Sequence, residues 1–113
     1  MWHYALTDVA QDDDDPRFIR VDYMYCIDEW NFVDNDWAKL LSIFRMLPGN
    51  YEERSSTWFG GNEEEERPPY LVGSVEPPGL QVSGVLAAED WRNWHSSFVL
   101  AIEESGLPLR HMP

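Results

Sequence analysis

The chain has 113 residues, of which 21 are Asp or Glu and 8 are Lys or Arg, so its formal net charge is -13. A field of this sign repels nucleic acid and anionic lipid surfaces and attracts basic proteins, which argues against direct binding to DNA, RNA or a membrane. Hydrophobic residues make up 43% of the chain and aromatic residues 14%, too much for a disordered acidic tail. We therefore expect one folded acidic domain over residues 1–113.

The cysteine content and the N-terminal sequence bear on the compartment. Cys26 is the only cysteine, which excludes an internal disulfide framework and fits a reducing environment. The first residues lack the basic region and apolar stretch of a signal peptide, and no run of about 18 apolar residues is present to cross a bilayer. The sequence therefore predicts a cytoplasmic protein.

Period-two alternation predicts two strands in the N-terminal third of the chain. Trp2, Tyr4 and Leu6 alternate with more polar residues and indicate a short strand, which ends before the four aspartates at 12–15. We expect that acidic run to form a loop. A longer alternation over residues 18–27 is the strongest strand signal in the chain.

A helix is predicted next, because Asp34 or Asn35 can cap it and apolar residues follow at spacings of three and four. Pro48 and Gly49 end the pattern. The predicted buried stripe consists of Trp37, Leu40, Leu41, Phe44 and Leu47.

Residues 51–69 are mostly polar and predict a surface excursion, with a short strand at 57–59 and an acidic run at 63–66. Residues 70–75 and 80–86 then read as two strands joined by a turn at Pro77, Pro78 and Gly79. A hairpin is the simplest arrangement of these strands.

A last helix is expected over residues 87–104, ended by Gly106 and Pro108, with Trp91, Trp94, Phe98, Ala101 and Ile102 on its core face. The order of strands and helices predicts an α+β fold, in which an antiparallel sheet of about four to five strands has two helices packed on one face. A parallel α/β sheet is disfavoured because too few helices are available as crossovers.

No residue pattern in the chain specifies a reaction. His3, His95 and His111 lack the spacing of a two-histidine helical metal site, and one cysteine cannot build a thiolate zinc site. The chain has no nucleophile elbow, phosphate loop, dinucleotide fingerprint or EF-hand spacing. We therefore expect no catalytic residues, cofactor or metal, with His95 as a partly exposed surface residue and Cys26 packed as a small structural residue.

The segment 28–36 is the main candidate for a partner-binding surface, because it interleaves four carboxylates with two large aromatic side chains. The carboxylates of Asp28, Glu29, Asp34 and Asp36 would steer a basic partner, and Trp30 or Phe32 would anchor it. In the alternative interpretation, both aromatic residues turn into the core and the acids cap the next helix.

A second candidate surface combines carboxylates and aromatic residues in the same way. Its members are Tyr51, Glu52, Glu53 and Trp58. Here too the alternative is that the aromatic residues belong to the core.

The chain resembles the immunity proteins of bacterial toxin systems in its size, its acidic segments at 12–15, 28–36 and 63–66, and its predicted C-terminal hairpin and helix. This is a resemblance of type and carries no family-specific motif. It implies a cytoplasmic stoichiometric inhibitor that binds a basic cognate toxin and blocks its active or substrate-binding cleft.

Three other functions are compatible with the sequence. The first is a DNA-mimicking inhibitor, encoded by a phage for example, of a nuclease or a defence system. The second is a small enzyme whose active site is assembled from residues far apart in the sequence. The third is an adaptor or subunit that uses its aromatic surface to assemble with itself or another chain.

Overall fold

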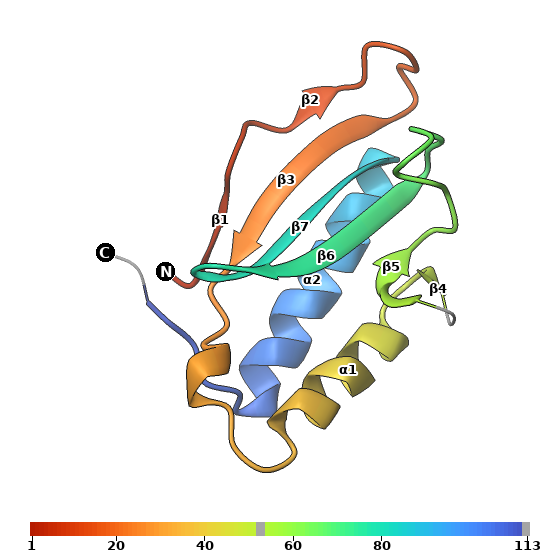
Figure 1. Cartoon of the computed structure of the whole chain (residues 1–113). Helices are drawn as coiled ribbons and strands as arrows, with labels where there is room; N and C mark the ends of the chain where they lie inside the picture. The colour runs from red at the N-terminus through yellow and green to blue at the C-terminus, as the bar shows by residue number, and fades with distance from the viewer. Residues whose placement is uncertain (52–53, 112–113) are drawn as a thin grey trace.

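The computed structural model describes residues 1–51 and 54–111 and places them in one antiparallel sheet with two α-helices (Figure 1). The helical elements are the 3₁₀ turn η1 (Glu29–Asn31), α1 (Asp36–Met46) and α2 (Ala88–Ser105). The strands of the described part are β1 (His3–Ala5), β2 (Ala10–Gln11), β3 (Ile19–Tyr25), β4 (Asn50–Tyr51), β5 (Arg54–Trp58), β6 (Tyr70–Glu76) and β7 (Gly79–Leu86).

The α+β class and the antiparallel sheet are confirmed, but the expected four to five strands are too few, because the described sheet has seven. Its order is β1-β3-β7-β6-β5-β4, with β2 also paired to β3. The long strand and the β6–β7 hairpin are where the alternation predicts them. The two strands without a sequence prediction, β2 and β4, are two residues long, which is too short for an alternating pattern to register.

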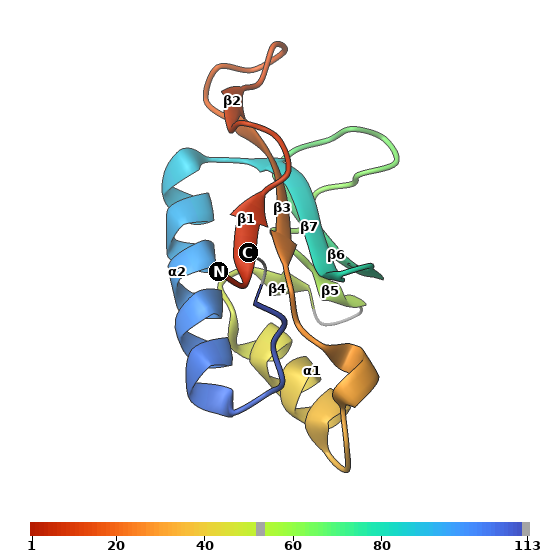
Figure 2. The same ribbon diagram turned by 90° about the vertical axis from the view of Figure 1, so that its left-hand side faces the viewer.

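Both helices lie on the same face of the sheet (Figure 2). Helix α2 buries Trp91, Trp94, Phe98 and Ile102 against the sheet, as the sequence predicts. It ends at Gly106, which has φ 78° in the left-handed region that glycine adopts without strain.

The predicted apolar stripe of α1 is partly wrong. Leu40, Phe44 and Leu47 are buried, but Trp37 is 46% exposed and Ile43 takes a core position instead. Helix α1 packs against α2, β4 and β5 and runs past the ends of the strands (Figure 2). Its first turn therefore has no sheet beneath it, and Trp37 remains at the surface.

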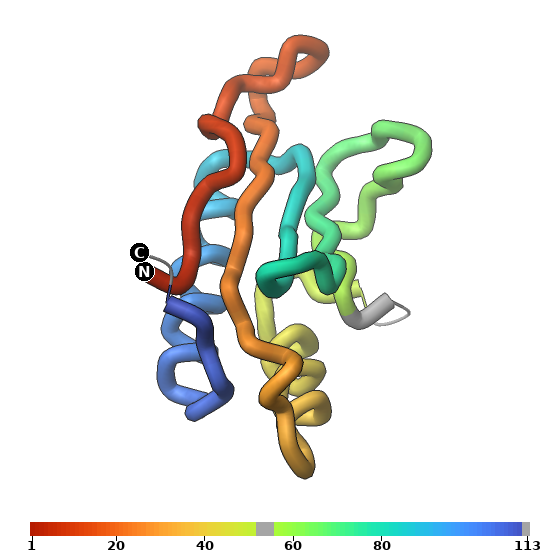
Figure 3. Tube along the Cα trace, turned by 60° about the vertical axis from the view of Figure 1, so that its left-hand side comes forward, coloured from red at the N-terminus to blue at the C-terminus, as the bar shows by residue number. Residues whose placement is uncertain are grey.

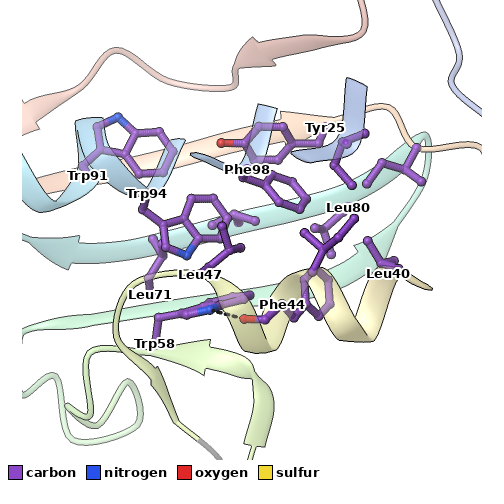
Figure 4. Packing of buried hydrophobic residues seen from close by; sticks show 14 of the residues in the cluster. Tyr25, Leu40, Phe44, Leu47, Trp58, Leu71, Leu80, Trp91, Trp94 and Phe98 are labelled. Carbon is purple, nitrogen blue, oxygen red and sulfur yellow. Dashed lines mark hydrogen bonds between the residues drawn. The ribbon is translucent and has the colours of Figure 1, made fainter. Parts of the chain in front are cut away.

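Interlocked aromatic rings form the centre of the core (Figure 4). The rings of Trp58 and Trp94 meet edge to face at 4.9 Å, and Trp58 also meets Phe44 at 5.3 Å. The indole Nε1–H of Trp58 donates to the backbone oxygen of Phe44 at 3.1 Å, which joins β5 to α1. Trp58 is completely buried, so its assignment to a partner-binding surface is wrong.

Neither α-helix of the described chain covers the opposite face of the sheet (Figure 2). Gln81 on β7 donates through Nε2 to Asp22 Oδ1 on β3 at 2.8 Å.

Beyond the end of β3, the backbone N–H of Arg110 donates to the oxygen of Cys26. Cys26 is fully buried, as expected for a structural residue, and burial raises the pKa of its thiol.

Candidate functional site

Segment 28–36 forms a corner of the molecule between β3 and α1. Four apolar residues belong to this segment and the first turn of α1, and we call them the aromatic corner: Trp30, Phe32, Val33 and Trp37. The side chains of Trp30 and Val33 lie in solvent, because these residues are 81% and 64% exposed. Phe32 packs on the core and meets the Trp37 ring edge to face at 4.8 Å, which fixes the base of the corner.

Two of the predicted steering carboxylates are engaged within the chain. Arg110 forms an ion pair with Asp28 at 2.8 Å, and its Nη1 lies 3.8 Å from a carboxylate oxygen of Glu29. Both carboxylates are only 15% exposed, and the same guanidinium donates to the oxygen of Pro78 at 2.6 Å. Asp28 and Glu29 therefore help to hold the C-terminal segment against the β6–β7 turn.

The other two carboxylates of the segment differ from each other. Asp36 accepts a hydrogen bond from the backbone N–H of Val33 at 3.0 Å and lies 3.9 Å from Lys39, so it stabilises the start of α1. Asp34 is exposed and has φ 49°. The alternative in which both aromatic residues turn inward and the acids cap the helix is met only by Phe32, which packs on the core. Trp30 is exposed, and the N-cap residue of α1, Asn35, makes no side-chain capping hydrogen bond.

The second predicted patch is not assembled among the described residues. Tyr51 is 42% exposed, but Trp58 belongs to the core. Glu52 and Glu53 lie outside the residues that the structure describes.

The two acidic runs, far apart in sequence, lie at the same end of the sheet (Figure 3). One occupies the β2–β3 turn, and the other is the tip of a small hairpin closed by backbone hydrogen bonds between Asn62 and Arg67. In the first run, Asp12 is buried against Arg20 at 2.7 Å, and the Arg17 guanidinium lowers the pKa of Asp15 to about 2. Residues 13, 14 and 63–66 are exposed.

Two tyrosine–histidine pairs lie between α2 and the edge of the sheet, and sequence analysis missed them. Tyr25 is hydrogen-bonded to Nδ1 of His95 and Tyr23 to Nδ1 of His3, each at 2.7 Å. The two imidazole rings are 5.4 Å apart. His95 is partly exposed, as expected, but its ring also packs against the rings of Tyr23, Tyr25 and Trp91. Its position four residues after Trp91, on the same helix face, is the signal that could have placed it.

The chemistry available to these pairs is limited by burial. Tyr25 is fully buried, and burial raises its pKa far above the ordinary value, so its hydroxyl stays neutral. Burial lowers the pKa of both His3 and His95 and favours neutral rings. The pairs connect β1, β3 and α2, and Tyr25 has no solvent access from which to reach a substrate.

The neutral histidines predict a loss of stability in mild acid. Because their native pKa values lie below the ordinary 6.5, the unfolded chain takes up protons first, and the free energy of unfolding falls as pH drops below about 6.5. Urea unfolding between about pH 7.5 and 5.5 measures this slope, since most carboxylates remain ionised there. His95→Gln should flatten the slope, and replacement of the exposed His111 by Gln should leave it unchanged. Equal slopes in all three proteins would contradict this assignment.

Among the described residues, no three His, Cys, Asp or Glu side chains are grouped to hold a metal ion. In the same part of the chain, no helix is both long and apolar enough to cross a bilayer. Comparison of the chain with models of protein families, with characterised proteins and with solved structures gives no match. Function must therefore be inferred from the surfaces themselves.

Proposed function

We propose that this protein is a stoichiometric inhibitor of the immunity type, which binds a basic cognate toxin and blocks its active or substrate-binding cleft. The observation that carries the proposal is Trp30, a tryptophan 81% exposed to solvent. Tryptophan is enriched among the residues that dominate binding energy at protein interfaces. Its burial by a partner would provide a large apolar contribution that the free protein forgoes.

The base of the aromatic corner supports its use as a preformed contact. Phe32 is anchored on the core and packs against Trp37, so part of the corner is ordered before a partner arrives. Preorganised contacts lose less conformational freedom on binding and therefore give more net affinity.

The charge of the chain supports a basic partner. Segment 28–36 carries four carboxylates, and the cations that pair with them among the described residues are Lys39 and Arg110. The ion pairs of Asp28 and Glu29 reduce their part in steering, which leaves Asp34 and the net charge of -13 as the source of long-range attraction. The aromatic corner would then hold the partner after encounter.

The test uses the protein encoded by the neighbouring gene as the candidate toxin. Inhibition should be complete at one inhibitor per toxin. Trp30→Ala should weaken binding by about 2 kcal/mol or more, close to 30-fold, mainly through faster dissociation. Added salt should slow association much more than it alters dissociation. Surface plasmon resonance at several ionic strengths measures both rates.

Met46 gives a matched control, because it is 79% exposed at the other end of α1. Met46→Ala should leave both binding rates unchanged. Both variants should unfold within about 0.5 kcal/mol of the parent protein, since neither side chain is buried. Unchanged affinity of Trp30→Ala, together with association indifferent to salt, would remove the support for this proposal.

A DNA-mimicking inhibitor remains a second candidate, and the shared location of the two acidic runs favours it. A mimic would present its carboxylates to a nucleic-acid-binding cleft, so its binding should depend on residues 13, 14 and 63–66 and not on Trp30. Charge-neutralising variants of these residues, measured beside Trp30→Ala against the same partner, separate the two modes.

A further inference from the structure

An open groove of about 460 Å³ lies on the uncovered face of the sheet, lined by Glu63 of one acidic run and by Arg20, which pairs with Asp12 of the other. Its position follows from the strand order, because β7 separates β3 from β6 and the runs precede these two strands. The polar side chains that line it include Asp8, Arg20, Asp22, Glu63, Tyr70 and Ser83. Strand β2 and the start of β3, which contribute to the groove, lie at the opposite end of the molecule from η1 and the start of α1 (Figure 1).

Tyr70 is the feature that distinguishes this groove from an ordinary acidic surface. The residue is only 7% exposed, yet it lines the groove. Its hydroxyl makes no hydrogen bond within the described residues, and it is not among the polar atoms sealed from solvent without a partner. A buried ring with an unpaired hydroxyl open to a groove is a position where a ligand can complete the hydrogen bonding.

The charges of the groove define the ligand that fits. Asp8, Asp22 and Glu63 outnumber the one cation that lines it, Arg20. Arg20 is paired with the buried Asp12, and its charge also acts on the Tyr70 hydroxyl, so the three carboxylates leave the groove with an excess of negative charge. Burial raises the pKa of Tyr70, which therefore stays a neutral hydroxyl able to accept a hydrogen bond from a cation.

We propose that this groove binds the cationic side chain of an arginine or lysine in a basic polypeptide, with its charge among the carboxylates and a hydrogen bond to the Tyr70 hydroxyl. The groove would give the partner a second point of contact, in addition to the aromatic corner. It rests on the proposed function only for the class of partner, a basic protein, and not on Trp30.

The probe is a capped tri-arginine peptide, titrated into isotopically labelled protein and followed by NMR chemical shifts. Saturable shifts should cluster at Asp8, Asp22 and Ser83. Tyr70→Phe keeps the buried ring and removes only the hydroxyl, so it should weaken binding about fivefold. Glu63→Gln should weaken it about threefold.

Glu64→Gln is the matched control, because it removes the same charge from the same exposed run but lies outside the groove. It should leave the peptide affinity unchanged. Equal effects of Glu63→Gln and Glu64→Gln, or shifts spread along both acidic runs, would show unspecific attraction and overturn the proposal. Tighter binding of free spermidine than of the peptide at the same residues would overturn the polypeptide as the source of the cation.

Trp30→Ala should bind the peptide as the parent protein does. Failure of the groove is thus distinguishable from failure of the proposed function, which is tested with the toxin at the other end of the molecule.

Discussion

Trp94→Ala is expected to lower the free energy of unfolding by about 3 to 5 kcal/mol, because it removes a fully buried indole and leaves a cavity that the surrounding rings cannot close. Trp94 stacks on Trp91 and contacts the rings of Trp58 and Phe98. Its removal therefore deletes packing contacts both within α2 and between α2 and the sheet. Urea denaturation followed by far-ultraviolet circular dichroism measures the change without relying on tryptophan fluorescence.

Trp94→Phe is the control for this prediction. The indole Nε1 of Trp94 is buried without a hydrogen-bond partner among the described residues, so phenylalanine deletes an unsatisfied donor as well as part of the ring. We expect a clearly smaller loss of stability than with alanine. An unfolding curve of Trp94→Ala that coincides with the parent curve would show that the helix face is not packed as described.

Trp58→Ala should be destabilising by a similar amount, about 3 to 5 kcal/mol, and should not act as a selective binding variant. The reason is that Trp58 is fully buried between α1 and α2 and donates to the backbone of Phe44. Partner affinity, measured where the variant remains folded, should stay near the parent value. A Trp58→Ala variant with unchanged stability but no partner binding would contradict this prediction and show that Trp58 belongs to the binding surface.

The conservative variants separate packing from hydrogen bonding at these two positions. Trp58→Phe loses the bond to Phe44, whereas Trp94→Phe loses none, so we expect the first to cost about 1 kcal/mol more. The centroids of the two indole rings are 4.9 Å apart, so the rings are in contact. The stability loss of the double alanine variant should therefore differ from the sum of the two single losses.

Some elements of this fold can be predicted from the sequence and others cannot, because only some of them depend on patterns of neighbouring residues. The alternation around Val21 and Tyr25 and the helical spacing of Trp91, Trp94 and Phe98 are patterns of neighbouring residues, and the elements form where these patterns predict them. Strands β2 and β4 exist because β3 and β5 provide edges for them to pair with. No local pattern of two residues encodes such pairing.

The candidate surfaces show the same division. The sequence alone predicted that segment 28–36 combines carboxylates with aromatic residues, and the exposure of Trp30 agrees with a surface role. The sequence also predicted Trp58 at the surface, because it lies in a mostly polar segment. Its burial depends on the packing of α1 and α2, which the local sequence does not show. The ion pairs of Asp28 and Glu29 depend on Arg110, which is distant in sequence.

The acidic charge, the long strand, the final hairpin and both helices can be predicted from the amino-acid sequence alone, because each depends on composition or on contacts between near neighbours. Tertiary contacts, in contrast, fix the exposure of Trp37, the pairing of Tyr25 with His95, and the groove that Arg20 and Glu63 line together. Those outcomes depend on strand order and helix placement, which bring together residues that no local pattern relates.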